Sequence, residues 1–336
     1  MPTALVTGCA GFIGSHLSER LLADGYRVIG LDNFDPFYDQ ATKQINLLAS
    51  LQQPAFTFHE LDLRDGPAAL ATALAAEKVD VVVHLAAKAG VGPSVKEPAA
   101  YVEANVLGTV HLLEWMRLSE VKNLFFASSS SVYGNTVELP FREDMALLAA
   151  CISPYAASKL SAEQLTFTYH HLYGLNVLNA RFFTVYGPRQ RPDLAIHKFA
   201  RLLLAGQPIP VYGDGSTARD YTFVADTVDG VARGIAYLLA HAGTYQTINL
   251  GNSSPVKLRD LIAAVGTAVG VTPTLNQLPM QAGDVEVTYA DISKARHLLG
   301  YNPQTTLADG LRHFVDWLQK SEAAPTKPLL ASATGV

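Results

Sequence analysis

Tyr155 and Lys159 lie four residues apart in SPYAASKLSAEQL, a segment whose pattern is that of a helix. On a helix this spacing places both side chains on one face. A phenol is a poor base near neutral pH because its ordinary pKa is about 10, but a nearby ammonium and a cationic cofactor ring would favour the phenolate. The pair is therefore a candidate for proton transfer; the alternative is an ordinary exposed helix pair.

A serine cluster precedes this pair in FFASSSSVYG, at the end of an expected strand. Parallel sheets bind ligands at the edge formed by the carboxyl ends of their strands. A hydroxyl at this edge could polarise the substrate oxygen that Tyr155 deprotonates. Which serine would do so is not decided by the pattern.

A glycine-rich turn opens the chain, where TALVTGCAGFIGSHL places Gly8, Gly11 and Gly14 between a strand and a helix. Glycine suits a tight turn that phosphates approach closely and that brings a helix against the sheet. The free amides at the start of the helix then bind the phosphates. The G-x-x-G-x-x-G spacing differs from the G-x-G-x-x-G of many dehydrogenases, so the neighbouring elements must support the assignment.

Asp32 ends the second expected strand, RVIGLDN, about 20 residues beyond the glycines. A carboxylate there accepts hydrogen bonds from the adenosine ribose and repels the additional phosphate of NADP. The sequence therefore predicts NAD rather than NADP. The alternative is a glycine turn followed by a surface aspartate.

Strands and helices alternate along the first half of the chain. Compact apolar runs predict strands at 4–6, 28–31, 56–61, 79–85 and 124–127, and helical spacing occupies 13–23, 68–76 and 102–116. This alternation predicts an α/β fold, a Rossmann-type doubly wound parallel sheet, with a smaller C-terminal substrate-binding lobe. We expect the NAD-binding domain at residues 1–180 plus about 217–245, the nucleotide-sugar-binding lobe at 181–216 and 246–320, and a flexible tail at 321–336.

Composition excludes several classes of protein. The net charge of −5 and the lack of a basic cluster argue against nucleic acid as a partner. No apolar run approaches the ~20 residues of a membrane span, and the start lacks the features of a signal peptide. Two cysteines, Cys9 and Cys151, favour the reducing cytoplasm. The histidines show no metal-binding spacing, so we expect no metal, and His84 is interpreted as a packed structural residue.

Several motifs together resemble the extended short-chain dehydrogenase/reductases, and among them the nucleotide-sugar epimerases, most closely the UDP-glucuronate 4-epimerases. The motifs run in consistent order from about residue 3 to residue 315. They are TGCAGFIG, LDNFD, HLAAKAGV, SSSSVYG, YAASK, RFFTVYGPRQRPD, RDYTFVAD and AGDVEVTYAD.

This resemblance implies roles for individual residues. The catalytic residues would be Ser129, Tyr155, as the base, and Lys159, which also binds the nicotinamide ribose. The cofactor-binding residues would be Gly8, Gly11, Phe12, Ile13, Gly14, Asp32, Asn33, Asp62, Leu63, Ala86, Lys88, Tyr155 and Lys159. The substrate-binding residues would be Ser129, Ser130, Ser131, Thr184, Arg191, Tyr212, Arg219 and Asp284.

The same resemblance implies NAD as cofactor and a UDP-sugar as substrate. Related dehydratases carry an Asp-Glu pair after the catalytic Thr, and decarboxylases commonly carry a Glu just before VYG, but this chain has Ser130 and Ser131 there. Without those acids we expect a 4-keto sugar to be reduced again on its other face, which is 4-epimerisation. The alternatives are a UDP-glucose/UDP-galactose 4-epimerase and a non-catalytic NAD-binding regulator.

The choice of UDP-glucuronate depends on RFFTVYGPRQRPD, where Thr184 and Arg191 would bind the sugar carboxylate. A guanidinium meets a carboxylate with two parallel hydrogen bonds. Arg189 is the rival for this role, and the alternative for Arg191 is a loop residue paired with Asp193.

One departure from the family is Gln281, where many epimerases carry an arginine; Arg219 or another cation would then compensate the diphosphate charge. Cys9 in the glycine turn is interpreted as a small buried apolar residue. The long helices around 102–116 and 155–173 resemble those that form homodimers in this family.

Overall fold

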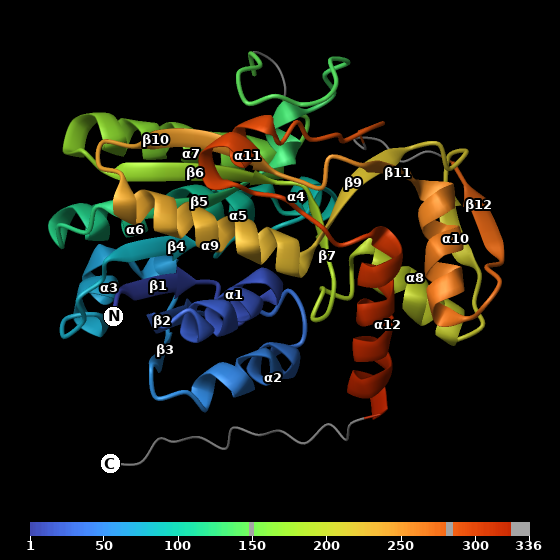
Figure 1. The fold of residues 1–336 in the computed structure, drawn as a ribbon, viewed down its shortest axis with the longest axis horizontal. Coiled ribbons are helices and arrows are strands. Elements are labelled where there is room, and N and C mark those ends of the chain that lie inside the picture. The colour runs from blue at the N-terminus through green and yellow to red at the C-terminus, as the bar shows by residue number, and fades with distance from the viewer. Residues whose placement is uncertain (148–150, 280–284, 324–336) are drawn as a thin grey trace.

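A seven-stranded parallel sheet forms the centre of the protein (Figure 1), which the computed structural model describes for residues 1–147, 151–279 and 285–323. The strand order is β10-β6-β5-β4-β1-β2-β3, and every pairing between neighbours is parallel. Leaving out β10, this is the 3-2-1-4-5-6 order of dinucleotide-binding folds. The predicted α/β class is confirmed.

The large sheet consists of β1 (Thr3–Thr7), β2 (Arg27–Asp32), β3 (Phe56–Glu60), β4 (Val81–His84), β5 (Asn123–Ser129), β6 (Asn176–Phe182) and β10 (Tyr245–Leu250). Its helices are α1 (Phe12–Ala23), α2 (Gln40–Leu51), α3 (Pro67–Ala73), α4 (Val91–Lys96), α5 (Pro98–Val102), α6 (Gly108–Leu118), α7 (Pro154–Tyr173), α9 (Val224–Ala240) and α11 (Ser293–Leu299). Short 3-10 turns cover Leu63–Asp65 and Ser130–Tyr133, and a π-helical segment, Glu103–Leu107, joins α5 to α6.

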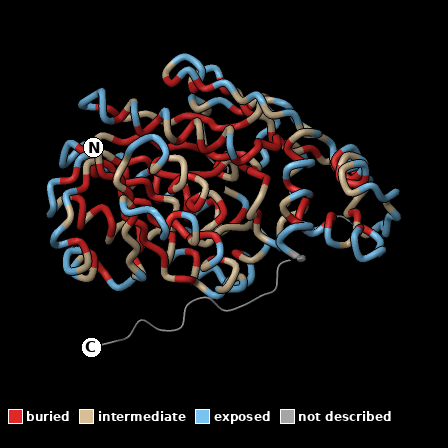
Figure 2. Tube along the Cα trace, turned by 60° about the horizontal axis from the view of Figure 1, so that its bottom comes forward, coloured by how far each residue is buried: buried red, intermediate tan, exposed pale blue. Residues whose placement is uncertain are grey.

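Successive residues of the central strands enter two different hydrophobic cores. Val6 and Val83 belong to the core on the side of α1 and α9, whereas Leu5 and Val82 belong to the core on the side of α3 and α6. Both faces of the sheet are therefore covered, as the unbroken apolar run of VDVVVHLAA predicts. Figure 2 shows buried segments concentrated in the interior and exposed segments mainly at the periphery.

The second lobe lies to the right in Figure 1 and is built around two small sheets, β11-β9-β7 and β12-β8. Its elements are β7 (Thr184–Tyr186), α8 (Ala195–Leu204), β8 (Ile209–Tyr212), β9 (Ala218–Phe223), β11 (Pro255–Lys257), α10 (Leu258–Val269), β12 (Leu275–Leu278) and α12 (Leu307–Ala323).

The expected domain boundaries differ from the structure at three elements. β9 was expected in the NAD-binding domain but joins a small sheet of the second lobe, and α11 was expected in the second lobe but packs against α9 and β10. The sequence pattern also predicts residues from 246 onwards in the second lobe, but β10 pairs with β6 and forms an edge of the large sheet. Ile248 and Leu250 on this strand are fully buried, because α11 and its connections cover the edge. A six-residue apolar strand is too short for its sequence to indicate which of two sheets it joins.

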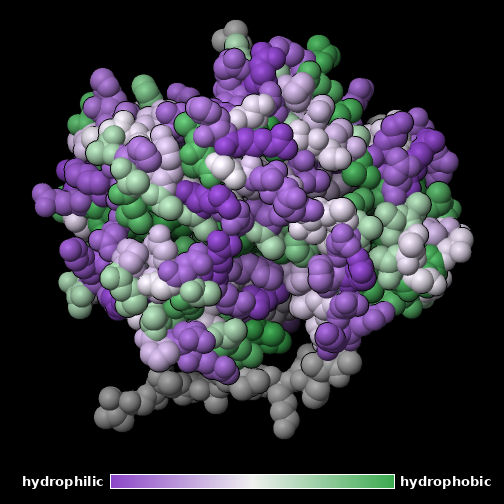
Figure 3. Space-filling model, viewed as in Figure 1, coloured by the Kyte–Doolittle hydropathy of each residue, from purple (hydrophilic) through white to green (hydrophobic). Residues whose placement is uncertain are grey.

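The surface seen in Figure 3 is mostly hydrophilic, with apolar side chains scattered among polar ones. None of the helices in the described part of the chain is long and apolar enough to cross a membrane. Among these residues no group of three or more histidine, cysteine or acidic side chains could hold a metal ion.

Candidate functional site

The glycine turn brings three backbone segments into close approach at the carboxyl end of β1. Gly8 has a φ of +73°, and a Cβ placed on it would lie 2.8 Å from the backbone nitrogen of Ala86. A Cβ on Gly14 would lie 2.1 Å from the carbonyl oxygen of Gly8. Gly11 is the N-cap of α1, and no side chain caps the first amides of that helix. The turn therefore presents free amides to an anionic ligand.

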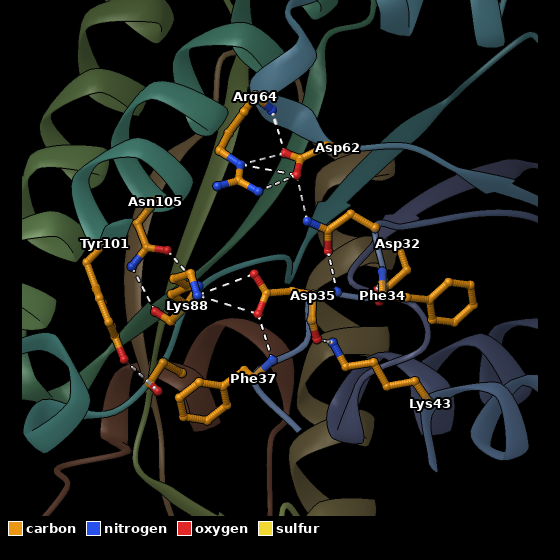
Figure 4. A network of polar contacts seen from close by, with 12 residues as sticks. Asp32, Phe34, Asp35, Phe37, Lys43, Asp62, Arg64, Lys88, Tyr101 and Asn105 are labelled. Carbon is orange, nitrogen blue, oxygen red and sulfur yellow. Dashed lines mark hydrogen bonds and ion pairs between the residues drawn. The ribbon is translucent and has the colours of Figure 1, made fainter. Parts of the chain in front are cut away.

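Asp32 lies at the end of β2, directly beside this turn. Its carboxylate accepts hydrogen bonds from the Ala10 amide at 3.1 Å and from the Phe34 amide at 2.9 Å. Burial raises the pKa of Asp32, while the Lys43 ammonium lowers it. Lys43 is itself buried and donates to the carbonyl oxygen of Asp35 at 2.7 Å. Figure 4 shows this network at the end of the sheet.

Asp62 extends the acidic side of the site from the end of β3. It accepts hydrogen bonds from the Asn33 amide group at 2.8 Å and pairs with Arg64 at 2.6 Å. The Arg64 hydrogen bonds are the main cause that lowers the pKa of Asp62 to about 2. Asn33, Asp62 and Leu63 all line one pocket together with the glycine turn.

Lys88 follows β4 and is held by a side chain from the π-helical segment. The Asn105 amide oxygen accepts from the Lys88 backbone amide at 2.8 Å, and its nitrogen donates to the Lys88 carbonyl and to the Ser158 hydroxyl, both at 2.9 Å. The Lys88 ammonium pairs with Asp35 at 3.3 Å. Asn105 thus joins the loop after β4 to Ser158 of α7, which precedes Lys159 in the chain. Figure 4 shows Asn105 beside Lys88. A π-helical turn at such a position is typical of functional sites.

The structure brings Ser129, Tyr155 and Lys159 together from two elements. Ser129 ends β5 and is buried, and its hydroxyl lies beside the Tyr155 phenol. Tyr155 is in the first turn of α7, where Ser153 caps the helix by accepting from the Ala156 amide. Lys159 lies one turn later and donates to the Ala127 carbonyl at 2.8 Å. The carboxyl end of β5 and the capped N-terminal part of α7 therefore hold these three side chains in one region.

The electrostatics of this group differ from the expectation in one respect. Burial raises the pKa of Tyr155, and the effects that oppose it come from Ser129 and Arg191, not from Lys159. Burial also lowers the pKa of Lys159 to about 8, against the opposing charge of Glu163. The chain alone therefore does not produce the lowered phenol pKa that the Tyr155–Lys159 spacing predicts. A further positive charge beside the phenol would lower its pKa.

Arg191 lies close to Tyr155, but it is already paired. Its Nε and Nη2 donate to Asp193 at 2.9 and 2.7 Å, so the alternative interpretation, a loop arginine paired with Asp193, describes part of the geometry. Its charge nevertheless lowers the pKa of the Tyr155 phenol, and its side chain lines the same pocket as Asp32. Arg189 instead pairs with Glu19 on α1 at 2.7 Å. The geometry favours Arg191 over Arg189 as the arginine of the site.

The remaining predicted substrate residues lie in the second lobe or beside the catalytic group. Ser130 and Ser131 form the 3-10 turn after Ser129, and both are partly exposed. Thr184 begins β7 and pairs with Tyr221 of β9, the strand that also carries Arg219. Tyr212 ends β8. Asp284 and Gln281 lie outside the described residues.

The interpretations of His84 and Cys9 as structural residues agree with the geometry, and two neighbouring phenylalanines are structural as well. His84 is buried between the hydroxyls of Thr7 and Thr109, at 2.8 and 2.9 Å, and burial lowers its pKa to about 3. Phe182 and Phe183 are buried in the core. Cys9 is fully buried, and a Cβ on Gly30 would lie 2.6 Å from its sulfur.

Several residues of the site were not predicted from the sequence. Asp35, Tyr38, Lys43 and Arg64 line the pocket at the glycine turn. The Tyr38 hydroxyl is buried and has no hydrogen-bond partner among the described residues. A signal was present, because DNFDPFYD concentrates polar and aromatic residues directly after the strand that ends in Asp32.

The residues present fit NAD. The pocket is lined by the glycine turn, by Asp32 at the place of a ribose-binding acid, and by apolar Leu31, Leu85 and Ala86. The close approaches at Gly8 and Gly14 leave no room for a side chain, as expected where a dinucleotide contacts the backbone. Of the predicted cofactor residues, Gly8, Gly11, Phe12, Asp32, Asn33, Asp62, Leu63 and Ala86 line this pocket.

Comparison with known proteins gives consistent results. Residues 5–314 match the model of the GDP-mannose 4,6 dehydratase family. A UDP-glucuronate 4-epimerase of Thermodesulfobacterium geofontis is 40% identical over 318 residues, which cover 94% of this chain and 96% of that protein. The crystal structure of UDP-glucuronic acid 4-epimerase from Bacillus cereus, with UDP-glucuronic acid and NAD, has a TM-score of 0.88 and 36% identity and covers 95% of this chain and 99% of that one. UDP-glucose 4-epimerase of Thermotoga maritima, with UDP-glucose, has a TM-score of 0.85 and 30% identity over 95% of this chain and 99% of that one.

Proposed function

The chain belongs to the GDP-mannose 4,6 dehydratase family, and we propose that within it the protein is an NAD-dependent UDP-sugar 4-epimerase that converts UDP-glucuronate to UDP-galacturonate. Relatives and structural neighbours that are UDP-sugar 4-epimerases, some solved with NAD, agree with the resemblance predicted from the motifs. The enzyme class therefore follows from these relatives and neighbours, and the substrate is proposed from the site.

The observation that carries the choice of UDP-glucuronate is the position of Arg191. Although the residue belongs to the loop before α8, its Nη2 donates to the Ala89 carbonyl, which also accepts from the Tyr101 hydroxyl, and the Tyr101 ring packs edge-to-face on Tyr155. The charge of the guanidinium also lowers the pKa of the Tyr155 phenol. A cation held beside the base lies within reach of the C6 carboxylate, because C5, which carries that carboxylate, is bonded to the reacting carbon C4. Ser130 and Ser131 add hydroxyl donors where related dehydratases and decarboxylases carry acids.

The residues of the chain divide the reaction between them. Tyr155 takes the proton of the sugar 4-hydroxyl, Ser129 hydrogen-bonds the same oxygen, and Lys159 keeps a positive charge beside the cofactor ribose. When bound, NAD accepts the C4 hydride and returns it. In the 4-keto sugar, Ser130 and Ser131 offer no carboxyl group that could catalyse elimination at C5 and C6. Turning the ketone and reducing its other face then gives the 4-epimer.

A single incubation tests the proposal. Purified protein is mixed with UDP-glucuronate, without added cofactor, and the products are followed by proton NMR. UDP-galacturonate is the expected product, formed by NAD that remains bound after purification. UDP-pentose would mean that the enzyme decarboxylates. No change, even with added NAD, would exclude the proposed substrate.

A specificity prediction separates the two arginines of the loop. Arg191→Gln should raise the KM for UDP-glucuronate at least about tenfold, because a charge-assisted hydrogen bond to a carboxylate contributes roughly 1.5–3 kcal/mol. Arg189→Gln, which breaks only the pair with Glu19, is the matched control and should leave that KM within about twofold. Inhibition by UDP, which has no sugar carboxylate, should be equal in both variants. Equal effects of the two substitutions on UDP-glucuronate would contradict the role of Arg191.

The second candidate substrate is UDP-glucose. The observation that favours it is that a neighbour solved with UDP-glucose has nearly the same TM-score as the uronate epimerase. The same NMR experiment with UDP-glucose distinguishes the two candidates through the ratio of their kcat/KM values.

We also propose a homodimer formed through α6 and α7. Leu118 of α6 is 63% exposed, and Phe167, Leu172 and Tyr173 of α7 are 48%, 58% and 40% exposed. Paired copies would remove this apolar surface from water. Light scattering of the purified protein should give twice the mass of one chain, and a single-chain mass would contradict the proposal.

A cytoplasmic location is proposed from the cysteines. Cys9 and Cys151 are both free, and Cys9 is fully buried, which suits a reducing compartment. Fractionation of the source cells, with detection of the protein by antibody, would test this.

A further inference from the structure

Arg191 is held in place by three different contacts, although it lies in an irregular loop between β7 and α8. Its Nε and Nη2 donate to the two carboxylate oxygens of Asp193 at 2.9 and 2.7 Å. Its Nη2 also donates to the Ala89 carbonyl at 3.3 Å. The guanidinium carbon lies 4.9 Å from the centre of the Phe37 ring. These contacts come from both lobes of the protein.

The Ala89 carbonyl connects the Arg191 guanidinium to the catalytic base through Tyr101. The Ala89 carbonyl also accepts a hydrogen bond from the Tyr101 hydroxyl at 3.1 Å. The Tyr101 ring packs edge-to-face on Tyr155, with 6.1 Å between their centres. The guanidinium is thus positioned relative to Tyr155 through one carbonyl and one aromatic ring. Phe37, on the loop between β2 and α2, also lies against Lys88, whose ammonium is 6.0 Å from the ring centre.

One edge of the guanidinium stays available. Among the described residues, Nη1 of Arg191 makes no hydrogen bond, and it is not a buried atom without a partner. Asp193 and the Ala89 carbonyl therefore use Nε and Nη2 and leave Nη1 for a ligand. The Arg191 side chain is 15% exposed, whereas Asp193, at 40%, lies on the solvent side of the pair.

We propose that Asp193 and Phe37 are positioning residues that fix Arg191 for the carboxylate of the substrate. The inference rests on the proposed function, because it concerns how Arg191 is oriented to bind the carboxylate of UDP-glucuronate. A long side chain that is already immobilised loses less conformational entropy when it binds, so its fixed geometry increases affinity. The same geometry decides the fate of the 4-keto sugar.

A 4-keto uronate is a β-keto acid, and it loses carbon dioxide when the C5–C6 bond aligns with the ketone π-system. In that loss the C5–C6 bond breaks, its electron pair forms the enolate of the C4 ketone, and C5 then takes a proton. Return of the hydride to C4 would then give the UDP-pentose. A carboxylate held at one orientation by a fixed guanidinium is kept out of this alignment. Arg191 without its supports would still attract the carboxylate but would no longer fix its rotation.

The test compares two neighbouring ion pairs of the same loop. Asp193→Asn removes the charge that holds Arg191, and Glu19→Gln removes the charge that holds Arg189, which faces α1. Phe37→Leu removes the ring beneath the guanidinium and gives a second, independent variant. For each protein, bound NAD and thermal unfolding report folding, and three quantities are measured: the KM for UDP-glucuronate, the inhibition constant of UDP, and the NMR ratio of UDP-pentose to UDP-galacturonate.

Asp193→Asn and Phe37→Leu are expected to raise the KM for UDP-glucuronate by about 3- to 10-fold, the order expected for lost preorganisation. They should also increase the UDP-pentose fraction, while UDP inhibition stays within about twofold of the unmodified protein. Glu19→Gln should change none of these. A merely structural role of Asp193 would not alter the product ratio.

Three outcomes would overturn the inference. An unchanged KM and product ratio in a folded, NAD-containing Asp193→Asn protein would make Asp193 an ordinary surface partner. A lower KM would show that Asp193 competes with the substrate for Arg191. If the unmodified protein makes no UDP-galacturonate, the proposed function fails and the inference with it, whereas an active unmodified protein with unaltered variants overturns the inference alone.

Discussion

Tyr155→Phe should reduce the kcat for UDP-glucuronate by about 10³-fold or more, because proton transfer by a positioned side chain contributes roughly 10²–10⁴-fold. The substitution removes only the hydroxyl, so the ring contact with Tyr101 and the capped first turn of α7 are retained. The variant should therefore fold and keep its cofactor. Steady-state kinetics, together with the NAD released on denaturation, measure both quantities. Retained activity would remove Tyr155 from the mechanism.

The pH dependence of the same reaction gives a second measurement. Burial holds the pKa of Tyr155 above its ordinary value of 10 in the chain alone, so the phenol is neutral at pH 7. The phenolate is the reactive base, so kcat should rise with pH. A positive nicotinamide ring beside the phenol would move this rise to lower pH. The rise should be absent from Tyr155→Phe, and a rise that persists there would assign the titration to another group.

Much of the fold could be predicted from the sequence because the strands are short, apolar and separated by helical spacing. Leu5 and Val6 enter opposite cores, which is why runs without alternation predict a sheet covered on both faces. The position of β10 could not be predicted in the same way. Its place beside β6 depends on pairing between residues about 70 positions apart, which no local pattern encodes.

The residues of the candidate site also fall into two groups, those that local spacing predicts and those that depend on tertiary contacts. The glycines, Asp32 and the Tyr155–Lys159 pair are predictable because each depends on a local spacing that the backbone converts into geometry. Arg189 and Arg191 could not be told apart, since two residues of an irregular loop point to different sides: one pairs with Glu19, the other approaches Tyr155. The direction of the pKa shift of Tyr155 could not be predicted from local spacing either, because burial of the phenol depends on the whole fold.

The second large expected effect concerns the free energy of unfolding and depends on a buried ion pair next to the catalytic group. Glu163 lies one turn after Lys159 on α7 and accepts hydrogen bonds from Arg181 at 3.0 and 2.8 Å. Their side chains are 4% and 6% exposed. Glu163 also accepts a hydrogen bond from the Ser128 hydroxyl, next to Ser129. Burial lowers the pKa of Arg181, but the hydrogen bonds and charge of Glu163 raise it more, so the guanidinium remains charged.

Glu163→Gln should lower the free energy of unfolding by about 3–5 kcal/mol, because breaking a buried ion pair leaves an uncompensated charge in the interior. One nitrogen of Arg181, Nη1, is already buried without a hydrogen-bond partner among the described residues. The loss should appear in denaturant unfolding of the NAD-containing protein. The matched control is the double variant Glu163→Met with Arg181→Met, which removes both charges and should recover much of the lost stability. A double variant as unstable as Glu163→Gln would show that the Ser128 hydrogen bond, not the ion pair, stabilises this junction of β5, β6 and α7.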